Sequence, residues 1–218
     1  ASNIQFTGAL NATGNDIDSI QVDVTDNGNV GSGGGGTINL GTVNVEISPV
    51  NDDPTNAGGL PTDITAAEET ASDVDLSLID LADVDANGGS LTITLSTGAG
   101  GTLAATTGGG VTVGGSGTGV LTLDGTITDL NAFLDTASNI QFTGALDATG
   151  DDADTIQVDV SDNGNLGTGG GGTINLGTVN VDISAANDDP TNTGGLPADV
   201  TVTEDLASNI DLSAIDLA

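Results

Sequence analysis

The sequence predicts an all-β fold in which short strands form β-sandwiches and each repeat carries one short helix. Apolar and polar residues alternate over 91–95 and 156–160, the two-residue period of a strand with one buried face. The 35 glycines and the many Thr, Asn and Asp residues supply turns between such strands. An acidic, glycine-rich chain with 1% aromatic residues can also be disordered, but this strict alternation favours packed strands.

A long internal repeat organises the chain. Residues 1–10 recur unchanged at 137–146, and the match continues to the end of the chain with most positions identical. A repeat of 136 residues exceeds the short solenoid periods and has the size of a domain. The hexapeptide Asn-Asp-Asp-Pro-Thr-Asn occurs at 51–56 and again at 187–192, each time after a strand-like run. Its proline cannot extend a strand ladder, so we interpret the hexapeptide as an interdomain linker.

These linkers divide the chain into three parts. We expect residues 1–50 to be the C-terminal half of one repeat, residues 51–187 to be a complete repeat, and residues 188–218 to be the N-terminal part of the next. Because the pattern is interrupted at both ends, we expect the chain to be a segment of a longer protein. Any targeting signal would then lie outside it.

Within the complete repeat we expect strands at 63–65, 74–81, 91–95, 111–113, 120–123, 140–142, 156–160 and 174–183. In the last strand the apolar residues change parity at Gly177, which predicts a β-bulge. The segment 128–134 predicts the helix, with Asp129 as its N-cap. Its buried face would consist of Leu130, Phe133 and Leu134. The glycine-rich segments 31–36 and 167–172 predict flexible hairpin connections, since no Lys follows them as in a phosphate-binding loop.

The absence of positively charged residues is the strongest constraint on function. The chain has 32 Asp and Glu residues and no Lys, Arg or His, so no carboxylate can form a salt bridge with another side chain of the protein. Crowded carboxylates repel one another and oppose compaction, and hard oxygen ligands select hard cations such as Ca²⁺ or Mg²⁺. A solvated acidic surface, as in halophilic proteins, would explain scattered acids but not their clustering at repeated positions.

Composition also excludes several classes of protein. Phosphate backbones would be repelled, which argues against nucleic-acid binding. Cysteine is absent, so neither a disulfide framework nor a thiolate site is available. No apolar run approaches the ~20 residues of a membrane span, and no signal peptide opens the chain, so we expect no membrane insertion in this segment. The expected partners are neighbouring repeats of the same chain and, in a fibre, identical chains.

Acidic residues gather at the linkers and at the ends of predicted strands. Two adjacent aspartates precede each linker proline, and an alternate-residue Asp-x-Asp pattern, which can turn two carboxylates toward one ion, occurs at 83–85. We interpret the group Asp151, Asp152 and Asp154 as a turn that can also bind a metal. The candidate metal ligands are Asp26, Asp52, Asp53, Glu68, Asp83, Asp85, Asp162, Asp188, Asp189 and Glu204.

Four motifs carry a resemblance to a known family. They are Val202-Thr203-Glu204-Asp205, Asp83-Val84-Asp85, Val160-Ser161-Asp162 and Ala186-Asn187-Asp188-Asp189-Pro190. Their order resembles that of cadherin repeats and, more closely, that of the cadherin-like tandem domains of giant bacterial surface proteins and adhesins. The resemblance covers the whole chain. It implies an immunoglobulin-like Greek-key sandwich of about seven strands, with Ca²⁺ at each junction between domains.

The resemblance also implies a ligand set for each junction. The first would take Asp52 and Asp53 from the linker and Asp83, Asp85 and Asp162 from the domain that follows. The second would take Asp188 and Asp189, with Glu68 and one of Asp151, Asp152 or Asp154 from the domain before. Two departures from the family pattern matter. No Arg is present to form the Asp-Arg-Glu motif, and Asp-Asp-Pro replaces Asp-Asn with a later Pro, so the number of ions is not implied.

The function expected from these features is mechanical. The chain would be a non-enzymatic, Ca²⁺-stiffened extender in a long bacterial extracellular or cell-surface adhesin or fibre. One alternative is an adhesive domain for glycan or cell recognition, although the chain has no Trp or Tyr for sugar stacking. A second alternative is a subunit of an extracellular filament, sheath or S-layer. An enzyme is the least expected class, because only pairs of carboxylates, as in glycosidases, are available for catalysis.

Overall fold

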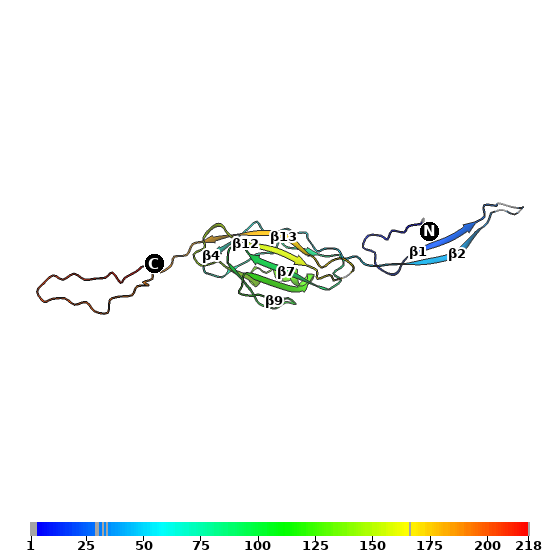
Figure 1. Ribbon diagram of the computed structural model, residues 1–218. Coiled ribbons are helices and arrows are strands. Elements are labelled where there is room, and N and C mark those ends of the chain that lie inside the picture. Colours follow the sequence, from blue (N-terminus) through cyan, green and yellow to red (C-terminus); the bar gives the residue numbers. More distant parts are fainter. Residues whose placement is uncertain (1–3, 29–30, 32, 34, 166, 218) are drawn as a thin grey trace. The chain divides into compact units, whose positions relative to one another are not determined.

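The computed structural model describes residues 4–28, 31, 33, 35–165 and 167–217 (Figure 1). The chain forms two units, residues 1–185 and residues 186–218. Strands make up nearly all of the regular structure in the described residues, with one α-helix and one short 3-10 helix, so the predicted all-β fold is confirmed. No helix among these residues combines the length and the apolar character that crossing a membrane requires.

Most strands of the first unit belong to two sheets. The larger sheet has the order β4 (Asp63–Ala67), β13 (Thr173–Ser184), β12 (Gly150–Ser161), β7 (Ser90–Thr97), β10 (Val120–Thr126) and β9 (Thr112–Gly114). Its neighbours are antiparallel except β13 and β4, which are parallel. The smaller sheet has the order β5 (Ser72–Asp73), β11 (Ile140–Thr143) and β8 (Thr102–Ala105). Two short strands, β3 (Thr55–Asn56) and β6 (Leu81–Ala82), form a separate pair.

One hydrophobic core joins the two sheets in a sandwich-like arrangement. On the larger sheet, Val158 of β12 is paired with Leu95 of β7, and both side chains are fully buried. The smaller sheet contributes Leu103 and Phe142, which are also fully buried. The alternation predicted for β7 and β12 is therefore confirmed, because their apolar residues lie on the face that the core covers.

The predicted β-bulge is present in β13. Val158 is paired with Gly177, but the next residue, Asp159, is paired with Asn175, so Leu176 is an extra residue on β13. Gly177 has a φ of +132°, in a region that L side chains rarely adopt. The extra residue changes the side-chain parity, which allows residues on both sides of the bulge to face the core.

The strand predicted over 74–81 is not one continuous strand. Strand β5 ends at Asp73, residues 77–78 form a turn, and β6 begins only at Leu81. Val74 and Leu76 are buried as the alternation predicted, whereas Leu78 is half exposed. Asp75 accepts the backbone N–H of Ser77 at 3.0 Å, and this local turn competes with a strand ladder.

The predicted helix is α1 (Ile127–Leu134), but its N-cap is Thr126 and not Asp129. The Thr126 hydroxyl oxygen accepts the backbone N–H of Asp129 at 3.2 Å, and the Asp129 carboxylate accepts the Thr126 hydroxyl at 2.7 Å. This reciprocal pair resembles a capping box and places Asp129 in the first helical turn. The predicted buried face of Leu130, Phe133 and Leu134 is confirmed.

Strand β12 begins earlier than the sequence indicated. Residues 151–154, interpreted above as a turn, belong to the strand and contain a register shift between Gly150 and Asp154. Asp152 in this irregular stretch has a φ of +51°. Turn-forming residues therefore produced a bulge within a long strand, because β13 continues far enough to pair with Gly150.

The first copy of this hairpin has the same pairing. Strands β1 (Gly14–Thr25) and β2 (Thr37–Ile47) pair in the register of β12 and β13, including the shift at Val22. Their apolar residues Ile20 and Val43 are exposed, whereas the counterparts Ile156 and Val179 are fully buried. In the second unit, Thr193 donates its N–H to the carbonyl of Asp216, as Ala57 does to Asp80 in the first. Equivalent sequences thus make equivalent local contacts.

Burial should make one phenylalanine far more important for stability than its copy in the repeat. Phe142 is fully buried, while Phe6, its counterpart, is 44% exposed. We expect Phe142→Ala to lower the free energy of unfolding by about 3–5 kcal/mol, because it opens a cavity in the core. Phe6→Ala is the control and should change it by less than about 1 kcal/mol. Scanning calorimetry suits this comparison because the chain has no Trp or Tyr. Equal effects would contradict the assigned core.

Candidate metal centre at the linker

The linker before the complete repeat is bound to two acidic loops. Asn51 donates from Nδ2 to Oδ2 of Asp162, which follows strand β12. Asp52 donates its backbone N–H to Oδ2 of Asp85 at 3.0 Å. Pro54 is buried, and Thr55 and Asn56 then pair with β6, so the chain is anchored immediately after these contacts. The linker therefore brings an amide side chain close to carboxylates that are distant in sequence.

The two loops hold their carboxylates through backbone hydrogen bonds. Asp83, just after β6, accepts the N–H groups of Asp85 and Ala86 on Oδ1, both at 3.0 Å. Asp162 accepts the N–H of Gly164 on Oδ1 at 3.0 Å and is fully buried. In each case short-range turn geometry fixes one oxygen, and the other oxygen faces the linker or the neighbouring carboxylate.

Three side-chain oxygens at this position are buried and have no hydrogen-bond partner among the described residues. They are Oδ1 of Asn51, Oδ2 of Asp83 and Oδ1 of Asp85. Burial raises the pKa of Asp83, and the neighbouring Asp85 carboxyl raises it further. Buried acceptors without donors are unfavourable, and two of these three belong to carboxylates in a chain without cations. Carboxylate and amide oxygens are the ligands that hard cations prefer.

The structure brings together only part of the ligand set predicted for this junction. Asp162 and Asp85 are hydrogen-bonded to Asn51 and Asp52, and Asp83 is connected to them only through the backbone N–H of Asp85. Asp52 participates through its backbone, and the side chains of Asp52 and Asp53 are exposed. Asn51 was not among the predicted ligands. Its position before the aspartate pair in both linkers was the available signal, since amide oxygens also bind Ca²⁺.

The remaining predicted ligands have different surroundings. Glu68 follows β4 and is 4% exposed, while Asp188, Asp189 and Glu204 are exposed residues of the second unit. A metal site that combines Glu68 with Asp188 and Asp189 stays a prediction. Asp26 is exposed and accepts the N–H of Gly28 at 3.0 Å, the same turn that Asp162 forms with Gly164. Asn29, beside that turn, lies outside the described residues, as do parts of the glycine-rich segment 31–36.

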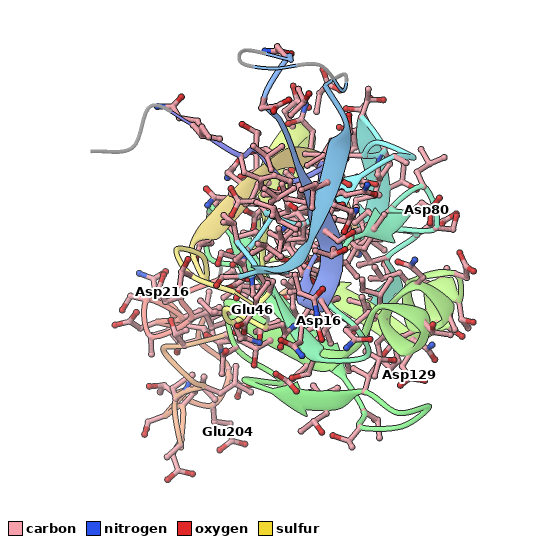
Figure 2. The ribbon with its side chains drawn as sticks, turned by 90° about the vertical axis from the view of Figure 1, so that its right-hand side faces the viewer. Asp16, Glu46, Asp80, Asp129, Glu204 and Asp216 are labelled. Carbon is pink, nitrogen blue, oxygen red and sulfur yellow. The ribbon has the colours of Figure 1, made fainter. Side chains whose placement is uncertain are left out.

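A second acidic cluster lies at the other end of the β12–β13 pair. Asp63 of β4, Asp152 of β12 and Asp182 of β13 have carboxylate oxygens within 4.8 Å of one another, close enough to hold a metal ion. Repulsion, mainly from Asp182, raises the pKa of the adjacent Asp151. Figure 2 labels the counterparts of two of these residues, Asp16 and Glu46, on neighbouring strands of the first hairpin.

Asp154 shows how a buried carboxylate can be satisfied without a metal. It is 3% exposed and accepts four backbone N–H groups. The donors to Oδ1 are Gly98, Ala99 and Thr155, at 2.9, 2.6 and 2.7 Å, and the donor to Oδ2 is Gly101 at 2.9 Å. The loop after β7 is thereby tied to the start of β12, and the Asp154 oxygens are already engaged.

Because backbone N–H groups bind both oxygens of Asp154, we expect both oxygens to contribute to stability. In Asp154→Asn the side-chain NH₂ can face the Gly101 N–H, which leaves a donor without an acceptor. We expect the free energy of unfolding to fall by about 1–3 kcal/mol, measured by denaturant titration with far-UV circular dichroism. Asp18→Asn changes the equivalent, exposed residue of the first hairpin and should have an effect within about 0.5 kcal/mol. A neutral result at Asp154 would contradict its anchoring role.

Comparisons of the chain with known protein families, with curated proteins and with solved structures find no match.

Proposed function

We propose that this protein is a non-enzymatic extender whose linkers are stiffened by Ca²⁺, as part of a long bacterial extracellular or cell-surface adhesin or fibre. The observation that carries the proposal is the trio of buried oxygens without partners on Asn51, Asp83 and Asp85. These oxygens lie where the linker meets the sandwich, so an ion bound there would hold both.

The chemistry of the oxygens favours Ca²⁺ over other cations. Ca²⁺ accepts six to eight oxygen ligands in flexible geometry, whereas Mg²⁺ demands a near-ideal octahedron. Asn51, Asp83, Asp85 and the nearby Asp162 would supply an amide oxygen and carboxylate oxygens, and water would complete the shell. Soft or borderline metals are disfavoured, because the chain has no Cys, His or Met.

The mechanism rests on charge. Burial raises the pKa of Asp83, and the neighbouring Asp85 carboxyl raises it further, so the charged form of Asp83 is unfavourable when no cation is bound. A divalent ion would compensate this charge and bind the linker residue Asn51 at the same time. The linker would then lose freedom, and a chain of such repeats would become stiffer. The two copies of the hexapeptide, one at each predicted domain boundary, support the same role at every junction.

Calcium should stabilise the wild-type protein and not a variant that lacks one ligand. At a Ca²⁺ concentration a hundredfold above Kd, binding to the folded state adds about 2.7 kcal/mol, which raises Tm by several degrees. Asp83→Asn keeps the Oδ1 acceptor but loses the charge, so most of this shift should disappear. Asp135→Asn, an exposed residue at the end of α1, makes the same charge change and should retain it. Coincident melting curves in Ca²⁺ and in chelator would refute the proposal.

In chelator, Asp83→Asn should be more stable than wild type, which is the opposite of the order expected in Ca²⁺. Because the pKa of Asp83 is raised in the folded protein, folding binds a proton between pH 3.8 and that raised value. The contribution of Asp83 to stability is therefore lost as the pH rises through this window. Asp83→Asn resembles the protonated form, so it should be more stable than wild type at pH 7. The difference should vanish below pH 3.8, where Asp83 is protonated in both the folded and the unfolded state.

Stiffening can be measured separately from stability. The chain has no Cys, so a pair of introduced cysteines accepts spin labels at unique positions. Thr42→Cys in β2 and Thr112→Cys in β9 are exposed sites on the two sides of the first linker. We expect the distance distribution from pulsed electron resonance to narrow when Ca²⁺ replaces chelator. A distribution of unchanged width would exclude a stiffened linker even if calcium binds.

A further inference from the structure

The glycine-rich loop between β12 and β13 contacts the linker through its backbone. Thr168 donates its N–H to the carbonyl of Pro49 at 3.2 Å, and Asn51 donates its N–H to the carbonyl of Thr168 at 3.4 Å. Val50 and Thr168 thereby form a parallel β-bridge. The composition of this loop, residues 167–172, predicted only a flexible connection. In the structure it is the surface on which the linker lies.

Two glycines of the loop are in contact with the linker where a side chain has no room. A Cβ at Gly167 would lie 2.6 Å from the backbone N of Asn51. A Cβ at Gly170 would lie 2.5 Å from Cβ of Asn51 and would overlap its amide group. Contacts below 3.0 Å are essentially never made by real Cβ atoms. The linker therefore approaches the loop more closely than any residue larger than glycine would permit.

This close approach fixes the Asn51 side chain. Gly170 lies against the amide group, and Nδ2 is held by Oδ2 of Asp162 and by the carbonyl of Asp52. The remaining oxygen, Oδ1, is buried and has no partner among the described residues. The loop thus lies against the amide group while hydrogen bonds hold its nitrogen, which leaves Oδ1 as the buried atom available to a cation.

We propose that the loop at 167–172 is a docking surface for the linker that enters its own domain, and that it positions Asn51 for metal binding. The second part rests on the proposed calcium site. The partner is a chain segment recognised by its backbone and by one Asn side chain. In the second linker, Ala185 and Ala186 replace Pro49 and Val50, but Asn187 retains the Asn. Recognition through the backbone tolerates the first two changes.

The test compares two alanine substitutions in the same loop. Gly170→Ala should displace Asn51, whereas Gly172→Ala should not, since a Cβ there meets nothing within 4 Å. Neither glycine has the positive φ that would strain an alanine. We expect Gly170→Ala to weaken Ca²⁺ binding, measured by calorimetric titration of the whole chain, by about 10–100-fold, as loss of an orienting contact typically does. Gly172→Ala should bind as wild type does.

Amide hydrogen exchange in chelator tests docking without any metal. The N–H groups of Asn51 and Thr168 should be protected in wild type and in Gly172→Ala, and should exchange faster in Gly170→Ala. Protected amides of Ile156 and Val158 would show that the sandwich remains folded. If all three proteins exchange alike, docking is refuted. If Gly170→Ala exchanges faster but binds Ca²⁺ with unchanged affinity, the positioning of Asn51 is refuted and the calcium site survives.

A third variant separates the linker side chain from the backbone contact. Asn51→Ala should weaken Ca²⁺ binding to a similar extent but leave Thr168 protected, because the Thr168–Pro49 hydrogen bond involves only backbone atoms. Unchanged affinity in Asn51→Ala would overturn the positioning role even if Gly170→Ala failed to fold. If wild type binds no Ca²⁺ while the exchange pattern appears as expected, the proposed function fails and docking alone is supported.

Discussion

The structure depends on how it accommodates carboxylates that have no positive side chain to pair with. All 32 acidic residues must be solvated, hydrogen-bonded to neutral donors, or neutralised from outside. Solvation suffices for exposed residues such as Asp53 and Asp80. It is not available to Glu68, Asp154 and Asp162, which are buried. Burial of an ion without a partner is strongly unfavourable, so these positions decide where the fold needs specific compensation.

The domain uses two different means of compensation. Around Asp154, four backbone amides converge on one carboxylate and tie a loop to a strand, and the arrangement is complete within the domain. Around Asp83 and Asp85, amide donors occupy one oxygen of each carboxylate and leave the other buried without a donor. The first arrangement is structural. The second is incomplete, and it lies at the linker, where an external ligand would connect two parts of the chain.

The features of the fold that depend on neighbouring residues alone could be predicted from the sequence. Alternation located β7 and β12, and the parity change at Gly177 located the bulge, because each follows from the two-residue period of a strand. The N-cap of α1 was predicted wrongly, because both Thr126 and Asp129 are of residue types that cap helices, and only the reciprocal hydrogen bonds between them show which one is the cap. The segment 74–81 continues the pairing of β5 with β11 only at its first residue, where Val74 donates its N–H to the carbonyl of Ile140 at 2.9 Å. That bond joins residues far apart in sequence, which no periodicity reveals.

In the candidate site, too, features set by neighbouring residues could be predicted, whereas those set by distant contacts could not. The acidic turns at Asp83 and Asp162 were recognisable because their backbone geometry is set within three residues. Asn51 was not, because its role arises from Asp162 and Gly170, both more than a hundred residues away. The glycine-rich loop was likewise interpreted as flexible from its composition. Glycine permits flexibility, but it also permits contact distances that no other residue allows. The second property accounts for Gly167 and Gly170, because a Cβ at either position would collide with Asn51.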